Sequence, residues 1–453
     1  MRSKTFHLLI LAALLLTAVS CGGNKPETPE TPQTPAETDL STLPSGNTTV
    51  IYEANPKVFA KTGALKSIES NLDRIAALQA NVLWLMPIHP VGIKNGVGSP
   101  YCVRDYRAVN PDYGTLDDLK SLVRTAHAKG FRVILDWVAN HTAWDNAWIT
   151  EHPDWYTKDV NGNIISPAGM GWNDVADLNY NSTALRTAMK EAMCWWVQEA
   201  DIDGFRCDYT DGVPTDFWTD AITALKALKG DKLLMLGESG DNKFYASGFD
   251  LLYAWSYAGN LPNVFKGSST VSSLYTVIRS DLSGLTGTQN RMRYIINHDT
   301  ASENAPASLY KSVDGTLAAF VLSAFLPGVP MIYSSQEVAY AQKINFFNYV
   351  LMDWNSNATC TAAYKRIMTA YAETEKYRGS APQLIENGKV ATVYYKAGTR
   401  KLLIMVNTDA TEVTVKTPME CVGADFKDLI AGTTQTMPSS LTLGGYGYKV
   451  YAK

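Results

Sequence analysis

Short apolar segments alternate with helical patterns from about residue 50 onwards, and this alternation constrains the fold more than any other feature. In chain order the segments are VIYEANPKVF, ANVLWLMPI, FRVILDWV, DGFRCD, KLLMLGE, FDLLYAW, MRYIIN and VPMIY. Helix-like stretches such as LDDLKSLVRTAHAKG and STALRTAMKEAMCWWVQEA lie between them. Strands separated by helices in this way favour an α/β fold of the (β/α)8 TIM-barrel type. An open doubly wound sheet is the alternative, but no glycine-rich phosphate loop follows the first strand.

Two regions depart from this alternation and predict additional structure. The connection after the third strand, residues 142–180, is too long for a structureless loop, so we expect a small inserted subdomain with DVNGNI as a hairpin turn. From about residue 380 the pattern changes to alternating strands such as VATVYYKA, KLLIMVN and TEVTVKT. The sequence therefore predicts a barrel domain over residues 48–375 and a C-terminal antiparallel β domain over residues 380–453.

The N-terminus has the pattern of a secretory signal. Arg2 and Lys4 precede the apolar run FHLLILAALLLTAV, and small residues lead to Cys21. The run is short for a membrane-spanning helix, and residues 21–47 form a tether rich in Pro, Thr and Glu. This order resembles a bacterial lipoprotein signal peptide at residues 1–20, with Cys21 as the lipidated first residue; an ordinary cleaved signal is the alternative. We expect a protein anchored by lipid in the bacterial cell envelope, at the outer membrane. The sequence does not distinguish the periplasmic face from the cell surface.

Charge and cysteine content exclude other classes of function. A net charge of −4 gives no electrostatic reason to expect a nucleic-acid partner. Without Cys21, the other cysteines are scattered and show no paired spacing, which argues against a disulfide framework or a zinc site. They are Cys102, Cys194, Cys207, Cys360 and Cys421.

The stretch DGFRCDYTDG places charged residues in a strand that otherwise reads as buried. Side chains at i and i+2 of a strand share a face, so Arg206 and Asp208 point into the barrel near its C-terminal mouth. A neighbouring cation favours the ionised carboxyl, so we expect Arg206 to lower the pKa of Asp208 and keep it a carboxylate at neutral pH. Taken alone, the pair could also be a structural salt bridge.

Polar residues follow three other strands and converge on the same mouth. They are Asp136, Asn140 and His141 after the third strand, Glu238 after the fifth, and Asn297, His298 and Asp299 after the seventh. Helix capping would explain one such residue but not the whole set. Two carboxyl groups in different environments are the usual machinery for cleaving a glycosidic bond, which makes this pattern indicative of a glycosidase.

The surroundings of each carboxyl predict its role. Arg206 assigns the nucleophile to Asp208. Glu238 follows apolar residues with no cation adjacent in sequence, so desolvation should raise its pKa and make it the general acid. Asp299 can stabilise positive charge on the sugar ring, while His141 and His298 donate hydrogen bonds to sugar hydroxyls.

These residues resemble the α-amylase family of glycoside hydrolases, family 13, over about residues 50–450. The resemblance rests on the ordered motifs GSPYCVRDY (98–106), DWVANH (136–141), ADLN (176–179), GFRCD (204–208), GES (237–239) and NHD (297–299). It implies a retaining mechanism on α-linked glucans through a covalent glucosyl intermediate on Asp208, with Glu238 as acid and Asp299 as transition-state stabiliser. It also implies that Tyr101 stacks beneath the sugar, that His298 binds substrate, and that a C-terminal β-sandwich follows the barrel.

The sequence departs from the family pattern at several positions. Many starch-degrading members carry a Lys-His pair where this chain has Asp211 and Gly212, and glycine is commoner than Ser335 in GVPMIYSSQE. Family calcium sites often use residues that correspond to Asn140 and Asp177, which predicts Ca²⁺ as the only cofactor, although Ca²⁺ takes six or more oxygen ligands. A loop-stabilising amide is the alternative role for Asn140.

Among the aromatic residues of the insertion, most are expected to form its own small core. Trp172, which lies in MGWND, is the one we expect to contact substrate.

Three functions are compatible with these residues. The first is a retaining α-glucan hydrolase that cleaves mainly α-1,4 bonds of starch-like glucans or maltooligosaccharides. The second is a glucan transglycosylase or branching-type enzyme of the same family, in which a sugar replaces water as acceptor. The third is a non-catalytic glucan-binding lipoprotein, which would be indicated by loss of a catalytic carboxylate, and none is missing.

Overall fold

The computed structural model describes residues 48–453. The predicted signal peptide at residues 1–20, the lipidated Cys21 and the tether at residues 21–47 lie outside the described residues.

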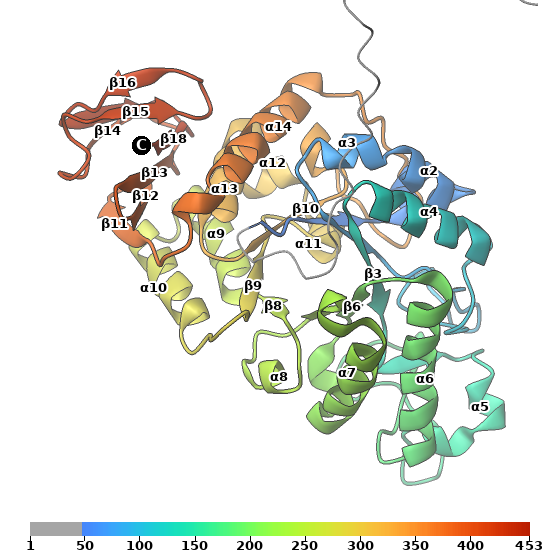
Figure 1. Ribbon diagram of the computed structural model, residues 1–453. Helices are drawn as coiled ribbons and strands as arrows, with labels where there is room; N and C mark the ends of the chain where they lie inside the picture. Colours follow the sequence, from blue (N-terminus) through green and yellow to red (C-terminus); the bar gives the residue numbers. More distant parts are fainter. Residues whose placement is uncertain (1–47) are drawn as a thin grey trace, which may run out of the picture. The chain divides into compact units, whose positions relative to one another are not determined.

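A closed barrel of parallel strands forms the centre of the fold (Figure 1). Its strands are β1 (Ile51–Ala54), β2 (Val82–Leu85), β3 (Arg132–Trp137), β6 (Gly204–Cys207), β7 (Leu234–Gly237), β8 (Leu251–Tyr253), β9 (Asn290–Arg293) and β10 (Val329–Tyr333). They are ordered β1-β10-β9-β8-β7-β6-β3-β2, so that β1 pairs with both β2 and β10 and closes the sheet. Each predicted apolar segment supplies one strand, which confirms the TIM barrel and rules out the open sheet.

Helices cover the outside of the barrel because their apolar faces pack on the strands. The longer ones are α4 (Leu116–Ala128), α6 (Thr183–Ala200), α7 (Thr215–Lys229), α9 (Trp255–Lys266), α10 (Val271–Leu282), α13 (Val313–Phe325) and α14 (Ala358–Glu373). Local sequence sets where they begin: Thr115 and Asp118 form a capping box at α4, and the Ser182 hydroxyl accepts from the Leu185 N–H at α6. Helix α13 is buried along almost all of its length, since it packs between the barrel and the C-terminal strand β13 (Arg400–Asn407).

One predicted boundary is wrong. The seventh strand, β9, ends at Arg293 rather than at Asn297. Asn297 instead caps helix α11 (His298–Glu303), because its side chain accepts from the Thr300 N–H. His298 and Asp299 therefore occupy the first turn of a helix, which fixes their backbone more firmly than a strand end would.

The insertion after β3 forms a small unit of its own. Strands β4 (His141–Ala143) and β5 (Val175–Asp177) pair antiparallel, and the short helix α5 (Trp148–Glu151) lies between them in sequence. The DVNGNI segment forms the predicted hairpin turn, with the Asp159 N–H donating to the Asn163 carbonyl at 2.9 Å. Trp148 and Trp155 pack edge to face at 5.1 Å, which supports their predicted role in the core of this unit.

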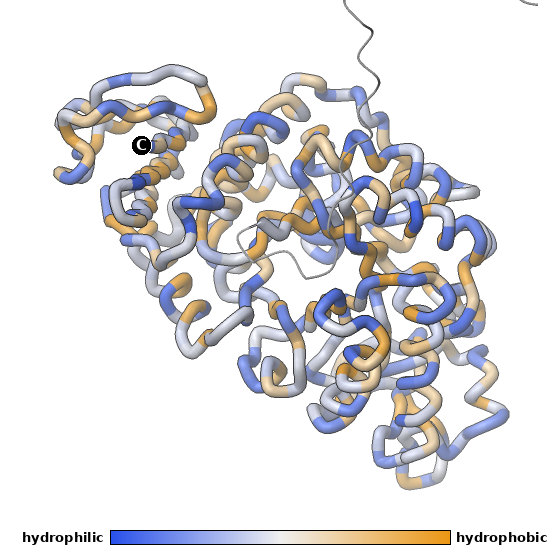
Figure 2. Tube along the Cα trace, in the orientation of Figure 1, coloured by the Kyte–Doolittle hydropathy of each residue, from blue (hydrophilic) through white to orange (hydrophobic). Residues whose placement is uncertain are grey.

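The C-terminal residues form antiparallel sheets. The larger sheet contains β11 (Gln383–Asn387), β12 (Val390–Ala397), β13, β18 (Tyr448–Ala452), β15 (Asp425–Asp428) and β16 (Thr434–Thr436). The smaller sheet pairs β14 (Val413–Lys416) with β17 (Ser440–Leu443). The two sheets share a hydrophobic core separate from that of the barrel, which confirms the predicted sandwich (Figure 2). The Tyr395 hydroxyl donates to the Phe325 carbonyl at 2.8 Å and joins this domain to the barrel.

The cysteines between residues 48 and 453 form no disulfide. Cys102, Cys194, Cys207, Cys360 and Cys421 are all free thiols, and the sequence alone did not show whether Cys360 and Cys421 pair. Between residues 48 and 453, no helix is both long and apolar enough to cross a membrane.

Candidate active site

A cleft of about 430 Å³ opens at the C-terminal ends of the barrel strands. The predicted residues that line it are Tyr101, His141, Trp172, Asp208, Glu238, His298 and Asp299. Arg206, Asn140 and Asp177 do not line it, and the Arg206 side chain is fully buried behind the cleft surface. The structure thus brings the three predicted catalytic carboxyls together at the mouth of one barrel.

Arg206 binds several carboxylates at once. Its Nη1 donates to Asp136 Oδ1 at 2.8 Å and to Asp208 Oδ1 at 2.9 Å. Its Nη2 lies 2.8 Å from Glu238 Oε1, as an ion pair without the alignment of a hydrogen bond. Its Nε donates to the Tyr253 hydroxyl at 3.1 Å. The predicted pairing of Arg206 with Asp208 is therefore present. The guanidinium also pairs with Glu238, and the sequence around Glu238 gave no sign of this second ion pair.

A glycine allows this strand to approach its neighbour. Gly204, at the start of β6, has φ of +147°, and a Cβ there would lie 1.9 Å from the Leu234 carbonyl oxygen. No other residue fits that position without moving β7. In this register Arg206 lies opposite Leu236 of β7, two residues before Glu238.

The predicted lowering of the Asp208 pKa is wrong. Burial raises the pKa of Asp208 to about 6, because the loss of hydration outweighs the attraction of Arg206, and Asp136 and Asp299 add repulsion. Burial raises the pKa of Glu238 further, to about 7, again against the attraction of Arg206. Burial thus raises the pKa of both acids, and the division between nucleophile and acid stays a prediction.

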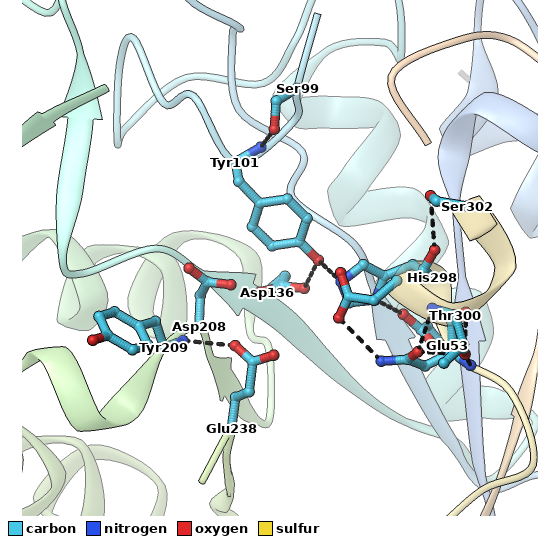
Figure 3. A network of polar contacts seen from close by, with 12 residues as sticks. Glu53, Ser99, Tyr101, Asp136, Asp208, Tyr209, Glu238, His298, Thr300 and Ser302 are labelled. Carbon is cyan, nitrogen blue, oxygen red and sulfur yellow. Dashed lines mark hydrogen bonds and ion pairs between the residues drawn. The ribbon is translucent and has the colours of Figure 1, made fainter. Parts of the chain in front are cut away.

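Glu238 is held by the turn that follows Asp208. The Tyr209 N–H donates to Glu238 Oε2 at 2.7 Å, and Tyr209 adopts a left-handed backbone with φ of +37° (Figure 3). This bond orients the carboxyl that faces the cleft beside Asp208.

Asp299 is the most exposed of the three acids, since half of its side chain is open to solvent. The Asn297 amide donates to Asp299 Oδ2 at 3.3 Å, and His298 Nε2 lies 3.3 Å from Oδ1. Both contacts orient the carboxylate while leaving it accessible to a bound sugar.

Tyr101 and His298 form one wall of the cleft. Their rings stack at 5.3 Å with an interplanar angle of 25°. The Tyr101 hydroxyl donates to Asp136 Oδ2 at 3.1 Å and lies 2.8 Å from His298 Nε2 (Figure 3). Phe346 packs edge to face against both rings. Because the aromatic ring of Tyr101 faces the cleft, it provides an apolar surface beside the carboxylates.

His141 has different neighbours. It is buried, and burial lowers its pKa to about 4, so the ring is neutral. Asn140 Nδ2 lies 3.3 Å from its Nδ1. Trp172 packs edge to face against His141 at 5.5 Å and against Tyr209 at 5.3 Å, and it lines the cleft as predicted.

Some cleft residues were missed by sequence reasoning. Trp255, at the start of α9, lines the cleft and is 39% exposed. Its indole lies over Gly240, two residues beyond Glu238, so it lies beside the segment that carries that carboxyl. Glu53 on β1 is completely buried and contacts His298. The signal for Glu53 was an acidic residue inside an apolar strand, the same kind of signal that identified Arg206.

The positions of Asp211 and Gly212 explain one departure from the family pattern. A Cβ at Gly212 would lie 2.3 Å from Asn140 Oδ1 and 2.5 Å from the Tyr209 ring, so no larger side chain fits there. Asp211 lines the cleft, and Lys243 Nζ lies 3.6 Å from its Oδ1. A cation is therefore present near this rim, but it comes from a later part of the chain.

The Ser335 departure also has a structural consequence. Ser335 has φ of +97°, a backbone conformation that glycine adopts without strain. Its N–H donates to Glu337 Oε2 at 3.1 Å in a buried turn after β10. The turn is retained, but serine holds it at a cost in backbone strain.

The predicted calcium ligands lie on neighbouring segments but do not complete a site. Asp177 pairs with His141 across β4 and β5, and the Leu178 N–H donates to the Asn140 carbonyl at 3.1 Å. Within residues 48–453, no group of three or more His, Cys, Asp or Glu side chains converges as metal ligands. Two oxygen donors do not fit the six or more that Ca²⁺ takes, so no step below involves a metal, and calcium stays a prediction.

Comparison with known proteins places the chain among glucan-active enzymes. Residues 38–162 and 169–381 match the model of the alpha amylase catalytic domain. The chain is 26% identical over 333 residues to Alpha-amylase 3 of Dictyoglomus thermophilum, covering 64% of each protein. It is 27% identical over 318 residues to a cyclomaltodextrin glucanotransferase of Bacillus licheniformis, covering 61% of this chain and 43% of the relative. The chain thus spans less than two thirds of the length of each of these two relatives.

Solved structures show the same architecture over most of the chain. A noncanonic maltogenic alpha-amylase from Thermotoga neapolitana superposes with a TM-score of 0.80 at 26% identity. An alpha-amylase from Lactobacillus plantarum superposes with a TM-score of 0.81 at 27% identity. Each comparison covers 90% of this chain and 99% of the other.

Proposed function

Because the chain belongs to the α-amylase family, we propose that it is a retaining glycosidase that cleaves α-glucosidic bonds, mainly α-1,4, in starch-like glucans or maltooligosaccharides. One observation carries this proposal: Asp208 and Glu238 face one cleft and share the Arg206 guanidinium, and burial raises the pKa of both. A nucleophile and an acid are the two groups that such a reaction requires.

In the first half of the reaction, Glu238 donates its proton to the glycosidic oxygen and becomes a carboxylate. The Asp208 carboxylate attacks the anomeric carbon from the opposite face, so that an ester bond forms as the bond to the leaving sugar breaks. The products of this step are the departing sugar, with a free hydroxyl where the bond was, and a glycosyl ester on Asp208.

In the second half, the Glu238 carboxylate takes a proton from a water molecule, and the resulting hydroxide equivalent attacks the anomeric carbon. The ester bond to Asp208 breaks, Asp208 leaves as a carboxylate, and Glu238 is again protonated. Two inversions at the same carbon restore the α configuration.

The other cleft residues stabilise the charge that develops on the sugar ring. Asp299 places a solvent-accessible carboxylate where the oxocarbenium-like charge forms. Tyr101 supplies a ring on which the sugar stacks, and His141 and His298 supply hydrogen bonds to its hydroxyls. Arg206 holds Asp208 and Glu238 in register without contacting the substrate.

The pKa values predict a bell-shaped pH profile. Asp208 must be ionised to attack, so activity falls as the pH drops below about 6. Glu238 must be protonated to act as an acid, so activity falls as the pH rises above about 7. Measurement of kcat/KM against pH on maltooligosaccharides tests both limbs.

Replacement of the nucleophile tests the assignment. Asp208→Asn keeps the shape of the side chain and its contact with Arg206 but removes the attacking charge, so turnover should fall by at least about 10⁴-fold. Binding of maltooligosaccharides, measured by calorimetry, should persist. Unchanged turnover would refute the role of Asp208, whereas wild-type protein that binds glucans and never cleaves them would support the non-catalytic glucan-binding alternative.

A transglycosylase is the second candidate, because one similar protein is a cyclomaltodextrin glucanotransferase. Trp255 is a partly exposed indole next to the segment of Glu238, on the side where a departing or accepting sugar would lie. Product analysis on maltotetraose separates the two: glucose, maltose and other shortened products support hydrolysis, while longer, cyclic or branched products support transfer.

We also propose that the protein is attached to the bacterial outer membrane through a lipid on Cys21. The support is the signal-like pattern at residues 1–20 and the Pro-rich stretch that follows it. Cys21→Ser should release the protein into the soluble fraction, and mass spectrometry of the wild-type N-terminal peptide should show the acyl chains. A soluble, unmodified wild-type protein would contradict this proposal.

A further inference from the structure

Glu53 contacts the reaction centre from behind, and the roles above do not use it. It lies on β1, and its Oε1 is 2.5 Å from His298 Nδ1. Both side chains are buried, and within the described residues the second carboxyl oxygen of Glu53 has no hydrogen-bond partner. A buried acid that contacts only a cleft histidine has no evident role in packing.

The contacts of His298 leave two arrangements of hydrogens. Either both ring nitrogens are protonated, or Nε2 is protonated and the proton between Nδ1 and Glu53 lies on the Glu53 carboxyl. Tyr101 has one hydroxyl hydrogen, which it donates to Asp136, so its oxygen accepts from Nε2–H of His298 at 2.8 Å. Glu53 and Nδ1 then share a further proton at 2.5 Å (Figure 3). The chain Glu53–His298–Tyr101–Asp136 therefore holds one proton more than a neutral imidazole and two carboxylates would carry.

Electrostatics place that proton on the ring. Burial alone would lower the pKa of His298, but the carboxylates of Asp299 and Glu53 outweigh burial and raise it to about 9. The other groups that face the pair are Asp136 on β3, Arg206 on β6, Asp208 directly after β6, Tyr253 on β8, Tyr294 and Tyr333. Of these, Arg206 opposes charge on the ring, while the carboxylates favour it.

His141 shows what happens without a carboxylate partner. It is equally buried in the same cleft, its ring contacts the Asn140 amide, and burial lowers its pKa to about 4. The two histidines differ in partners rather than in burial.

We propose that Glu53 is a positioning residue that fixes His298 as an imidazolium, with Nδ1–H directed at Glu53 and Nε2–H directed at the Tyr101 oxygen on the cleft side of the ring. This inference rests on the proposed function, since a hydroxyl of the sugar bound beside Asp299 would share Nε2–H with the Tyr101 oxygen. A charged donor forms a stronger hydrogen bond than a neutral ring would. Because the carboxylate of Glu53 can only accept, it keeps Nδ1–H of the ring directed towards β1 when substrate enters.

Histidine-selective NMR tests the proton placement directly. The chain contains 6 histidines, so the ring ¹⁵N signals of His298 can be assigned by their loss in His298→Gln. In the wild-type protein both ring nitrogens should be protonated at pH 7, with a midpoint at about 9. In Glu53→Gln the midpoint should fall towards the ordinary value of about 6.5, while the signals of His141 stay unchanged as an internal control.

Asp299→Asn separates the two carboxylates and provides a second variant if Glu53→Gln does not fold. Since Asp299 is half exposed, its replacement should leave the fold intact. The His298 midpoint should fall in Asp299→Asn, since Asp299 raises the pKa most, but it should stay above the midpoint of the Asp299→Asn, Glu53→Gln double variant, which lacks both carboxylates. Equal midpoints in these two variants would overturn the role of Glu53, as would a neutral His298 ring in the wild type at pH 7 or an unchanged midpoint in Glu53→Gln.

A binding experiment connects the proton to the substrate. In a Glu238→Gln background, the affinity for maltotriose is measured at pH 5.5 and pH 8. The ratio of the two values is the reference for the added change, because Asp208 and Asp136, whose pKa values burial raises to about 6, titrate in both proteins. The added Glu53→Gln change should weaken binding about tenfold at pH 8 and little at pH 5.5. The His298 ring of this variant is neutral at pH 8 and still charged at pH 5.5. Equal loss at both pH values would indicate a purely structural role and overturn the proposal. If the wild type cleaves no α-glucan while the NMR results hold, the proposed function fails and the proton placement stands.

Discussion

The regions around His298 and His141 show how one cleft gives the same residue opposite charge states. Both histidines are buried, and both line the cavity that contains Asp208 and Glu238. His298 contacts the carboxylates of Glu53 and Asp299, whereas His141 contacts an amide. Burial sets the default of a neutral ring, and only paired carboxylates reverse it.

The balance between burial and opposite charge also determines the pKa values of the acids that contact Arg206. Arg206 contacts Asp136, Asp208 and Glu238, and yet burial raises the pKa of all three. One guanidinium does not offset the desolvation of three carboxyls. The site therefore retains a proton on Glu238 near neutral pH, which is the state that an acid catalyst needs.

Removal of the general acid Glu238, which lines the same cleft as His298 and His141, should have the largest effect on activity. Glu238→Gln should lower kcat/KM on maltooligosaccharides by about 10³-fold or more, because the leaving oxygen no longer receives a proton. With α-glucosyl fluoride, whose leaving group needs little protonation, most of that loss should disappear. A loss of equal size on both substrates would mean that Glu238 is not the acid.

The comparison itself is tested by replacing each histidine. His298→Gln should lower kcat/KM by about 10²-fold, since it removes a charged donor beside Asp299. His141→Gln should lower it by only about tenfold, since a neutral donor is replaced by another neutral donor. Equal losses in the two variants, measured at the same pH, would break the distinction between the regions.

Removal of a single hydroxyl sharpens the description of the charged region. Tyr101→Phe keeps the ring that stacks on His298 but removes the contacts to Asp136 and Nε2. We expect a loss of about fivefold in kcat/KM and a pKa of His298 that stays raised, because Glu53 and Asp299 remain. Steady-state kinetics and the NMR titration check the two parts separately, and a His298 ring that becomes neutral at pH 7 would contradict the second.

The smallest effect should lie outside both regions. Ser335→Gly relieves a left-handed backbone in the turn after β10, so the free energy of unfolding should rise by about 1 kcal/mol with kcat/KM unchanged. Chemical denaturation and kinetics on the same preparation measure both quantities. A lower stability would show that the Ser335 side chain contributes more than its strained backbone costs.

Much of the architecture was predictable because strand alternation is a local property. The i, i+2 rule placed Arg206 and Asp208 on the interior face, and the structure puts both there. The position of Glu238 followed from the end of an apolar strand in the same way. The family resemblance added Tyr101.

The features that the sequence did not predict depend on how deeply the site is buried and on contacts between residues far apart in the chain. Glu53 and His298 are 245 residues apart, so nothing local connects them. The direction of the Asp208 pKa shift was wrong because sequence shows a neighbouring cation but not how completely the site is desolvated. The seventh strand was drawn too long because the apolar residues that follow Arg293 continue into the barrel mouth without pairing.

The covalent intermediate provides the most direct test of the central claim. An α-maltosyl fluoride that carries fluorine at C5 of the reacting ring forms the glycosyl ester readily and hydrolyses it slowly. Digestion and mass spectrometry of the treated protein should then find the added maltosyl group on the peptide that contains Asp208. Labelling of a different carboxylate, or turnover of the reagent to a β-configured product without any adduct, would contradict the account.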